Sequence, residues 1–316
     1  MAVFTHISRD ELEMLISHYD IGNLVSYEGI LQGIDNSNFI VTTSKEKLIL
    51  TIFESRIDPR DIPYFLGLMA HLSASEINCP SPLADKNQKT LSSIRGKPCA
   101  LFSFLDGKDA KADDITPELC RELGKILARM HLAGTTTPLT RPNSMGFDAW
   151  AARVHKVGSK ANTIETGLAA SLLSELSFLK DNWPQNLPIG NIHADLFPDN
   201  VFIKDDHIFG VIDFYFASTD MLAYDLAIVM NAWCFDPHNH FIKERWENLF
   251  LGYESHRLLT AEEKQNYHIL CRGAAMRFLS SRLHDLVFHD PTALVKPKPP
   301  TEYIRKLDFH RDTRLF

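Results

Sequence analysis

The chain has 316 residues and a formal net charge of −7, with 45% hydrophobic and 23% charged residues. These values are typical of a globular protein with a sizeable core, so the composition excludes a globally disordered chain. The negative charge argues against a nucleic-acid-binding surface, which needs an excess of Lys and Arg on one face. The length exceeds one compact core and predicts two lobes with an interface between them.

The N-terminal stretch MAVFTHISRDELEM carries charges where a signal peptide would be apolar, and no apolar run approaches the ~18 residues of a membrane span. We therefore expect a cytoplasmic protein without a membrane partner. The five cysteines are odd in number and widely spaced, without a C-x-x-C pair. They form neither a disulfide framework nor a zinc motif, and we interpret them as reduced core thiols.

The first part of the chain predicts helices around a small antiparallel sheet. A helix over 8–19 begins at Ser8, and Glu11 completes a capping box. The stretch 24–54 has strand character throughout, with turns at GIDNSN and SKEK. A helix over 63–75 and two more strands follow.

From about Asp106 the sequence becomes rich in helices, and we place the boundary so that the lobes are 1–103 and 104–316. Thr116 and Pro117 occupy the cap and first-turn positions of a helix that reaches His131. Helical spacing then predicts helices over 147–156, 166–182, 222–233, 240–256 and 261–288. The Pro-rich stretch LVKPKPPTEY is expected to lie extended on the surface. The result is an α+β protein with a sheet-containing first lobe and a mainly helical second lobe.

One segment, NIHADLFPDNVFIKDDHIFGVIDFYF, places polar residues between two apolar runs that predict strands. Protein kinases have a catalytic loop of the form H-R-D-x-x-x-x-N followed by D-F-G. HADLFPDN keeps the order of His193, Asp195 and Asn200, and VIDF then places Asp213 after a strand. This spacing predicts Asp195 as the base that accepts a hydroxyl proton, and Asn200 and Asp213 as magnesium ligands.

The two strands in this segment are joined at KDD, and we expect a hairpin whose ends bring Asn200 and Asp213 together. Asp and Asn are also common turn formers, which is the plainer interpretation of any one of these residues alone. We interpret His193 as a structural residue that hydrogen-bonds the loop backbone. Asp199 is either a turn residue or a polar neighbour of the metal.

Two further segments are candidates for nucleotide binding. The turn between the first strands can present backbone N–H groups to phosphates, and its candidate residues are Gly33, Ile34, Asp35, Asn36, Ser37 and Asn38. The segment ALFSFLDG lies where the lobes join, so its backbone can hydrogen-bond a purine ring through Ser103, Phe104 and Leu105. A polar hairpin and a buried edge strand with a turn are the alternatives without a ligand.

LGKILARMH, IHADLFPDNVF and GVIDF together resemble the aminoglycoside-phosphotransferase-like, or choline-kinase-like, branch of the protein-kinase fold. Within that branch, YDLAIVMNAWCF, IDFYFAS and LILTIFE are most similar to the homoserine kinases. The resemblance implies a two-lobe kinase that uses ATP and Mg²⁺ to phosphorylate homoserine in threonine biosynthesis. It implies the same roles for Asp195, Asn200, Asp213 and the residues from Gly33 to Asn38.

The sequence departs from the protein-kinase pattern at three positions. Protein kinases carry a phosphate-binding Lys in the strand after the phosphate loop, but LILTIF has Thr51 there. Tyr215 replaces the Gly of D-F-G and Ala194 replaces the Arg before the catalytic Asp. We therefore do not expect control by activation-loop phosphorylation. Lys47, on the same strand face as Thr51, is ~13 Å away at ~3.3 Å per residue and cannot replace that charge.

A zwitterionic acceptor needs a carboxylate for its ammonium and a cation or N–H donors for its carboxylate. The residues that follow the metal strand are candidates to line this pocket, namely Asp220, Tyr224, Asn231 and Trp233. Asp225 either joins them or anchors its helix, and Trp233 has the alternative of a core position. Candidate carboxylate clamps are Arg272, Arg277 and Arg282, whose alternative is a solvated charge.

Several alternatives stay open at this point. The acceptor can instead be choline, ethanolamine, an aminoglycoside or a sugar. Thr51 also suggests a pseudokinase that binds a nucleotide without transferring phosphate. His238 and His240 beside Asp236 hint at a metal site, although no third ligand follows at a suitable spacing.

Overall fold

The computed structural model describes residues 4–31, 36–289 and 296–316. It divides the chain into two compact units, Met1–Gly107 with Phe209–Tyr215 and Lys108–Ile208 with Phe216–Phe316. We describe each unit by itself. Among the described residues, no helix has the length and apolar character needed to cross a membrane. All five cysteines are free and buried, as predicted.

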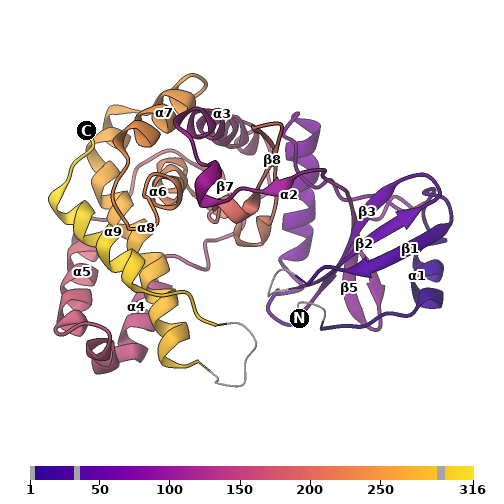
Figure 1. The fold of residues 1–316 in the computed structure, drawn as a ribbon, viewed down its shortest axis with the longest axis horizontal. Coiled ribbons are helices and arrows are strands. Elements are labelled where there is room, and N and C mark those ends of the chain that lie inside the picture. The colour runs from indigo at the N-terminus through magenta and orange to yellow at the C-terminus, as the bar shows by residue number, and fades with distance from the viewer. Residues whose placement is uncertain (1–3, 32–35, 290–295) are drawn as a thin grey trace. The chain divides into compact units, whose positions relative to one another are not determined.

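The first unit is built on an antiparallel sheet of five strands (Figure 1). Its strands, in sheet order, are β1 (Leu24–Gly29), β2 (Asn36–Thr43), β3 (Lys47–Phe53), β5 (Lys97–Ser103) and β4 (Ser92–Ile94). Strand side chains alternate between the two faces of a sheet, and Leu48, Leu50 and Ile52 of β3 are fully buried on one of them. These residues form a core cluster with Leu12 and Leu15 of the first helix.

The helix α1 (Arg9–Ile16) begins with the predicted capping box. Oγ of Ser8 accepts the backbone N–H of Glu11, and the carboxylate of Glu11 accepts the backbone N–H of Ser8. The two bonds satisfy N–H groups that the first turn of a helix leaves without partners. The second helix of this unit is α2 (Ile62–Ala74), close to its predicted bounds.

Residues 209–215 belong to the first unit because Asn78 holds them through its backbone and its side chain. Its carbonyl accepts the backbone N–H of Val211 at 3.0 Å, and its Nδ2 donates to the carbonyl of Phe209. Gly210 is needed here, since a Cβ would lie 2.8 Å from that same carbonyl oxygen of Asn78. The aromatic ring of Tyr215 then packs edge-on against Phe53 and Phe65.

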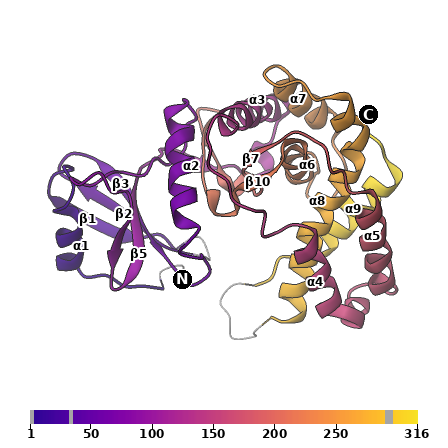
Figure 2. The same ribbon diagram turned by 180° about the vertical axis from the view of Figure 1, so that it is seen from behind.

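The second unit is mainly helical (Figure 2). Its α-helices are α3 (Pro117–Gly134), α4 (Phe147–Val157), α5 (Leu168–Asn182), α6 (Leu222–Trp233), α7 (Lys243–Glu254), α8 (Ala261–Val287) and α9 (Thr301–Asp312). Oγ1 of Thr116 caps α3 by accepting the N–H of Leu119, and Pro117 occupies its first turn, both as predicted. α3 packs along α7 at close range, and a Cβ at Gly124 or Gly252 would overlap the backbone of the other helix.

Two small sheets frame the segment that carries the catalytic motif. β7 (Ile189–Ile192) pairs antiparallel with β10 (Ser218–Met221). The other sheet has the order β6 (Lys108–Asp109), β8 (Val201–Lys204) and β9 (His207–Val211). β8 and β9 form the predicted hairpin, and both turn residues, Asp205 and Asp206, have positive φ as a two-residue type I′ turn requires.

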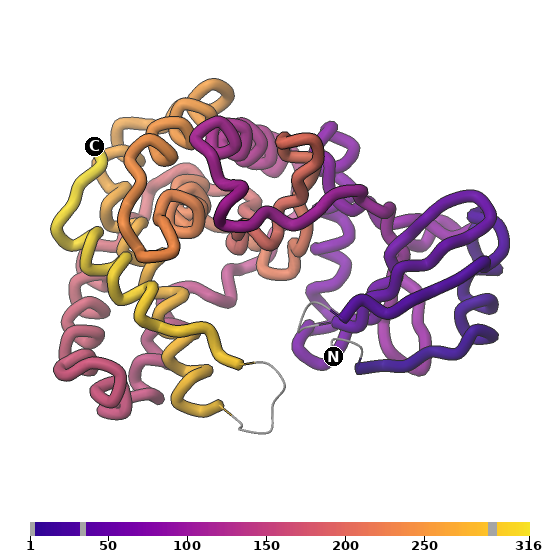
Figure 3. The backbone as a smooth tube through the Cα atoms, in the orientation of Figure 1, coloured from indigo at the N-terminus to yellow at the C-terminus, as the bar shows by residue number. Residues whose placement is uncertain are grey.

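The expectation of an extended chain through LVKPKPPTEY is wrong for its last three residues. Leu294 and Val295 lie outside the described residues, but α9 begins at Thr301 directly after Pro300. α9 runs beside α8, as the yellow end of the tube in Figure 3 shows. Tyr303, Leu307 and His310 are buried on one side of α9. The prolines precede the helix, where proline is tolerated, and do not interrupt it.

Candidate active site

The catalytic motif forms a tight loop between β7 and β8 in the second unit. His193 is buried, and its Nδ1 accepts the backbone N–H of Asp195 at 3.2 Å. This confirms the prediction that His193 hydrogen-bonds the loop backbone. The side chain of Asp195 is 20% exposed, so its carboxylate can meet a substrate hydroxyl.

The buried carboxylate of Asp225 holds the loop. Its two oxygens accept the backbone N–H groups of His193 and Ala194, each at 2.8 Å, and Oδ2 also lies 3.1 Å from Nε2 of His131. Burial raises the pKa of Asp225, but the bond and charge of His131 and the backbone bond of His193 outweigh it and keep the pKa below its ordinary value. Asp225 therefore anchors the catalytic loop and is not available to line an acceptor pocket.

The hydrogen bonds continue from His131 into the helical core. Nδ1 of His131 lies 2.8 Å from the hydroxyl of Tyr253, which also accepts a bond from Arg257. Arg257 in turn donates to the fully buried carboxylate of Glu263 at 2.8 Å. Buried polar groups need such partners, and this chain ties the loop to α3, α7 and α8.

Ala194 adopts a left-handed backbone conformation, with φ of 63°. This conformation costs an ordinary residue about 1–3 kcal/mol and persists only when the surroundings impose it. Here Asp225 accepts its N–H, and Nη1 of the buried Arg277 donates to its carbonyl. The turn that presents Asp195 is thus fixed from two sides.

Asn200 lies directly beside Asp195, as the motif predicts. Its Nδ2 donates to the backbone carbonyl of Asp195 at 2.8 Å and to its Oδ2 at 3.3 Å. With the amide nitrogen turned to Asp195, the side-chain oxygen of Asn200 is the atom that can ligate a cation. Magnesium is usually bound by one or two protein oxygens together with substrate phosphates, and such a donor fits that requirement.

Asp213 belongs to the first unit. It also has a left-handed backbone, with φ of 65°, directly before Phe214. Backbone strain of this kind clusters at functional sites. In the described ranges, no group of three or more His, Cys, Asp or Glu side chains could hold a metal ion.

Of the predicted phosphate turn, Gly33, Ile34 and Asp35 lie outside the described residues. Ser37 is fully buried, and its hydroxyl accepts the N–H groups of Phe4 and Thr5 and donates to Glu54. These bonds give the Ser37 side chain a structural role. Oδ1 of Asn36 accepts the backbone N–H of Glu54 at 3.2 Å.

Asn38 is paired with Thr51, the residue that stands where protein kinases have Lys. The two lie opposite each other in β2 and β3, and Oγ1 of Thr51 donates to Oδ1 of Asn38 at 2.7 Å. Lys47 is engaged elsewhere, with its ammonium 4.1 Å from the ring centre of Phe104. Thr51 is therefore a buried, neutral residue, and the charge of a bound nucleotide must be balanced by other groups.

The candidate purine-binding segment begins at the end of β5. Ser103 is the last residue that pairs with β3, opposite Leu48, and its hydroxyl accepts the N–H of Ser81. Phe104 and Leu105 follow outside any strand. The sheet therefore does not use their backbone groups.

Two of the acceptor candidates lie close together in the chain, Asp220 in β10 and Tyr224 at the start of α6. Asp220 accepts from Nδ2 of Asn143 at 2.7 Å and from the backbone N–H of Met221 at 2.7 Å. Burial raises the pKa of Asp220 above its ordinary value despite these bonds. Tyr224 is fully buried between Trp150 and Trp183, and its hydroxyl has no hydrogen-bond partner within the described part of the chain.

The other two acceptor candidates have partners inside the helical core. Nε1 of Trp233 donates to the carbonyl of Leu196 at 2.9 Å, and the ring is fully buried. Asn231 donates to the carbonyl of Cys271 and lies 2.7 Å from Nε2 of His310. These contacts favour the core alternative for both residues, and we leave them out of the acceptor site.

The remaining polar residues of the motif region have local roles. Asp199 is 58% exposed and pairs with Lys298 at 3.5 Å, which fits the interpretation as a turn residue. Asp236 accepts the backbone N–H groups of His238 and His240. These histidines and Asp236 do not form a metal site in the structure.

Sequence reasoning missed two residues that shape the loop. His131 ended a predicted helix without an assigned role, and Arg277 was one of three equivalent arginines. Their partners, Asp225 and Ala194, are 94 and 83 residues away in the chain. A buried His followed at long range by a buried Asp leaves no local pattern, so only the tertiary structure shows the pairing.

Comparisons with known proteins show the family to which the chain belongs. Residues 26–259 match the model of a family described as "Phosphotransferase enzyme family". The homoserine kinase of Rhizobium etli (strain CIAT 652) is 46% identical over 311 residues, which cover 98% of this chain and 96% of that protein.

Solved structures show the same fold at low sequence identity. Amicoumacin kinase hAmiN, in complex with AMP-PNP, Ca2+ and Ami, has a TM-score of 0.71 at 15% identity and covers 98% of this chain and 95% of its own. A choline kinase from Cryptosporidium parvum Iowa II has a TM-score of 0.65 at 13% identity, with coverages of 96% and 95%. These likenesses confirm the predicted α+β, kinase-like fold and the predicted resemblance.

Proposed function

The chain belongs to the phosphotransferase enzyme family, and from this premise we propose that it is an ATP-dependent homoserine kinase. One observation carries the proposal. Asp195 and Asn200 lie in direct contact on a loop whose backbone is fixed by Asp225 and Arg277. The name of the Rhizobium etli relative supports homoserine as the acceptor.

The reaction transfers the terminal phosphoryl group of ATP to the hydroxyl of homoserine. The hydroxyl oxygen forms a new bond to the γ-phosphorus while the bond between that phosphorus and the β,γ-bridging oxygen breaks, which leaves ADP. The carboxylate of Asp195 accepts the hydroxyl proton. The fixed loop holds the carboxylate in place before the substrate arrives, so that positioning supplies much of the rate.

Magnesium, when bound, supplies positive charge that neutralises the nucleotide's phosphates, and we assign its protein ligands to Asn200 and Asp213. Nδ2 of Asn200 keeps its side-chain oxygen turned away from Asp195. We also propose that the backbone of Phe104 and Leu105 hydrogen-bonds the purine, since no strand uses it. The proposal that a turn covers the phosphates is kept for Gly33, Ile34 and Asp35, whereas Asn36, Ser37 and Asn38 lie in β2 and not in a turn.

A second candidate is a pseudokinase that binds ATP without transferring phosphate. Thr51 favours it, because the cation that protein kinases use at this position is replaced by a hydroxyl bonded to Asn38. The contact between Asp195 and Asn200 favours a catalyst, since a protein that only binds nucleotides needs no base.

An acceptor panel in an ADP-release assay tests these proposals. The panel contains homoserine, choline, ethanolamine, an aminoglycoside and a hexose, each with Mg-ATP, and the product is identified as a phosphate monoester by ³¹P NMR. We expect homoserine to give the highest kcat/KM. A different preferred acceptor would refute the homoserine assignment, and ATP binding without turnover of any acceptor would identify a pseudokinase.

We also propose that the enzyme works in the cytoplasm, where ATP is available and where its five free, buried thiols stay reduced.

A further inference from the structure

The long helix α8 presents three arginines, and two of them are neutralised by carboxylates, of which Glu175 is buried and Glu302 is partly exposed. Arg272 donates from Nε and Nη2 to the two oxygens of Glu175, at 2.7 and 2.9 Å. Arg282 donates from Nη1 to Oε2 of Glu302 at 2.5 Å. Such pairs satisfy a buried guanidinium, so neither residue has its charge available for a ligand.

Arg277 differs because no carboxylate of the described chain lies within hydrogen-bonding distance of it. Its closest ion pair joins Nη2 to Oδ1 of Asp195 at 3.8 Å. Nη1 donates to the carbonyl of Ala194, and Nε has no partner among the described residues. The side chain is only 1% exposed, so this donor is both buried and unsatisfied, which is costly unless a ligand or water completes it.

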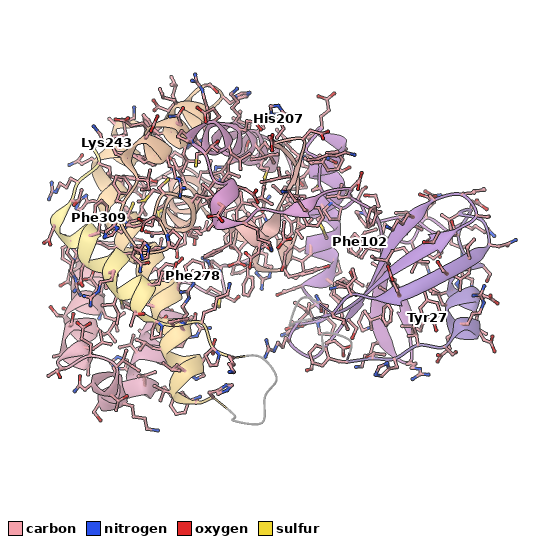
Figure 4. The ribbon with its side chains drawn as sticks, in the orientation of Figure 1. Tyr27, Phe102, His207, Lys243, Phe278 and Phe309 are labelled. Atoms are coloured by element: carbon pink, nitrogen blue, oxygen red, sulfur yellow. The ribbon has the colours of Figure 1, made fainter. Side chains whose placement is uncertain are left out.

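The orientation of the guanidinium is fixed. Its carbon lies 4.2 Å from the ring centre of Phe278, which is labelled in Figure 4, and 5.6 Å from that of Phe216. In an arginine, Nε–H and one N–H of Nη2 point in the same direction and form a two-pronged edge. Nη1 is used to hold the loop, and the Nε–Nη2 edge is the part of Arg277 that remains for a ligand.

The second unit contains further buried polar atoms without partners among the described residues. The hydroxyl of Tyr224 and Nη1 of Arg153 are also buried without partners in the described ranges. Burial raises the pKa of both Asp220 and Tyr224, and the charge of Arg277 acts against that rise in each case. Arg277 thus acts electrostatically on both acceptor candidates, Asp220 and Tyr224, and lies 3.8 Å from Asp195.

We propose that the Nε–Nη2 edge of Arg277 binds the carboxylate of an amino-acid acceptor and thereby selects a hydroxy amino acid over an amino alcohol. This assignment rests on the proposed kinase function. Arginine binds planar carboxylates through two parallel hydrogen bonds, which fix both position and orientation. Nη2 of Arg277 is 3.8 Å from Oδ1 of Asp195. When Arg277 binds the carboxylate of a short hydroxy amino acid, the hydroxyl of that amino acid can therefore reach Asp195.

The test compares homoserine with 3-aminopropan-1-ol, which is homoserine without its carboxylate. For the unaltered enzyme we expect kcat/KM to be higher for homoserine by roughly ten- to a hundredfold, the worth of a charge-assisted pair. In Arg277→Gln, loss of the bond to Ala194 should lower kcat for both acceptors, and the preference for homoserine should fall to within about threefold through an additional rise in KM for homoserine alone. Arg277→Lys keeps the charge without the two-pronged edge and should retain only part of the preference.

Arg282→Gln is the matched control on the same helix. Its partner Glu302 keeps a second cation, Lys306, and the preference for homoserine should remain unchanged. If the Arg277 variants lose turnover of both acceptors by the same factor, Arg277 only positions the loop and the proposal is wrong.

A second comparison needs no variant and covers the case in which Arg277 substitutions fail to fold. Homoserine amide has a neutral group in place of the carboxylate, and its KM should exceed that of homoserine by at least tenfold, since a neutral amide cannot form the charge-assisted pair. Equal KM values would overturn the proposal. If the unaltered enzyme phosphorylates other acceptors but not homoserine, it is the proposed function that fails.

Discussion

Asp225 and Arg277 bind opposite backbone groups of the same residue, Ala194. Oδ1 of Asp225 accepts its N–H at 2.8 Å, and Nη1 of Arg277 donates to its carbonyl. Because both its N–H and its carbonyl are hydrogen-bonded, Ala194 can be held in a left-handed conformation that an unrestrained alanine would not keep. The next residue is Asp195, so one anion and one cation buried in the helical core set the position of the proposed base.

Asp225→Asn should loosen the loop. The carboxylate now faces the N–H groups of His193 and Ala194 and Nε2 of His131. In the variant, one of these three groups would face an amide NH₂ instead of an oxygen, and a buried donor would remain unsatisfied. We expect the free energy of unfolding to fall by roughly 3 kcal/mol and kcat to fall as well. Urea denaturation and ADP release measure the two effects, and unchanged values for both would contradict the anchoring role.

Asp195→Asn should abolish most turnover while leaving the fold intact. An amide cannot accept the hydroxyl proton, and loss of a general base reduces kcat by roughly 10²–10⁴-fold. ATP affinity, measured by calorimetry, should change little. Asp199→Asn is the control, since Asp199 is largely exposed and pairs only with Lys298, and it should keep full activity.

Asp213→Asn should weaken the binding of ATP in the presence of Mg²⁺. A neutral amide is a poorer ligand for a hard cation than a carboxylate. We expect the affinity for Mg-ATP to fall by at least tenfold, with a smaller change for ATP in EDTA. Equal affinity of the variant and the unaltered protein for Mg-ATP, measured by calorimetry, would argue against a metal role.

Asp220 is the acidic residue among the predicted acceptor residues, and with this carboxylate as the partner of the homoserine ammonium, homoserine binding should depend on pH. Burial raises its pKa, so it takes up a proton at a higher pH than an ordinary Asp. As the pH falls toward that raised pKa, the carboxylate becomes neutral and KM for homoserine should increase. Asp220→Asn should have a high KM that varies little over the same range, and a parallel pH profile for both proteins would refute the assignment.

His310 makes stability dependent on pH in the acid range. Burial, with the charges of Lys306 and Arg272, lowers its pKa from 6.5 to about 3. Between these values the unfolded chain binds a proton that the folded chain does not, so stability falls as the pH decreases, by about 1.4 kcal/mol per pH unit from this group.

His310→Gln should flatten this dependence. Nε2 of His310 lies 2.7 Å from Oδ1 of Asn231, and the amide of Gln offers a replacement donor. Urea midpoints between pH 6.5 and 4.5 provide the measurement, with the exposed His155→Gln as control. An equally steep decline in His310→Gln would show that other groups account for the acid sensitivity.

Helices whose ends carry a local sequence signal, such as a capping residue, were predicted with nearly correct bounds. α6 has the predicted bounds of 222–233, and α3 begins at the predicted cap, Thr116. The catalytic turn was predicted because its spacing is itself a local signal. α9 was missed because its buried residues, among them Tyr303 and Leu307, are scattered among charged ones and follow a run of prolines.

The long-range contacts that position the site residues leave no comparable pattern in the local sequence. Arg272, Arg277 and Arg282 recur every five residues on α8 and look equivalent in the sequence. Their difference comes from partners elsewhere in the chain, Glu175 for the first and Glu302 for the third. Tertiary packing alone decides which arginine keeps a donor available.

Neither unit is continuous in the chain, and this affects synthesis. The first unit includes Phe209–Tyr215, which the ribosome makes only after about half of the second unit. The second unit needs α9, whose Tyr303 and His310 lie buried in its helical core. Domains commonly fold in order as they are made. Here neither unit can be completed in simple chain order, because the first has to wait for Phe209–Tyr215 and the second for α9.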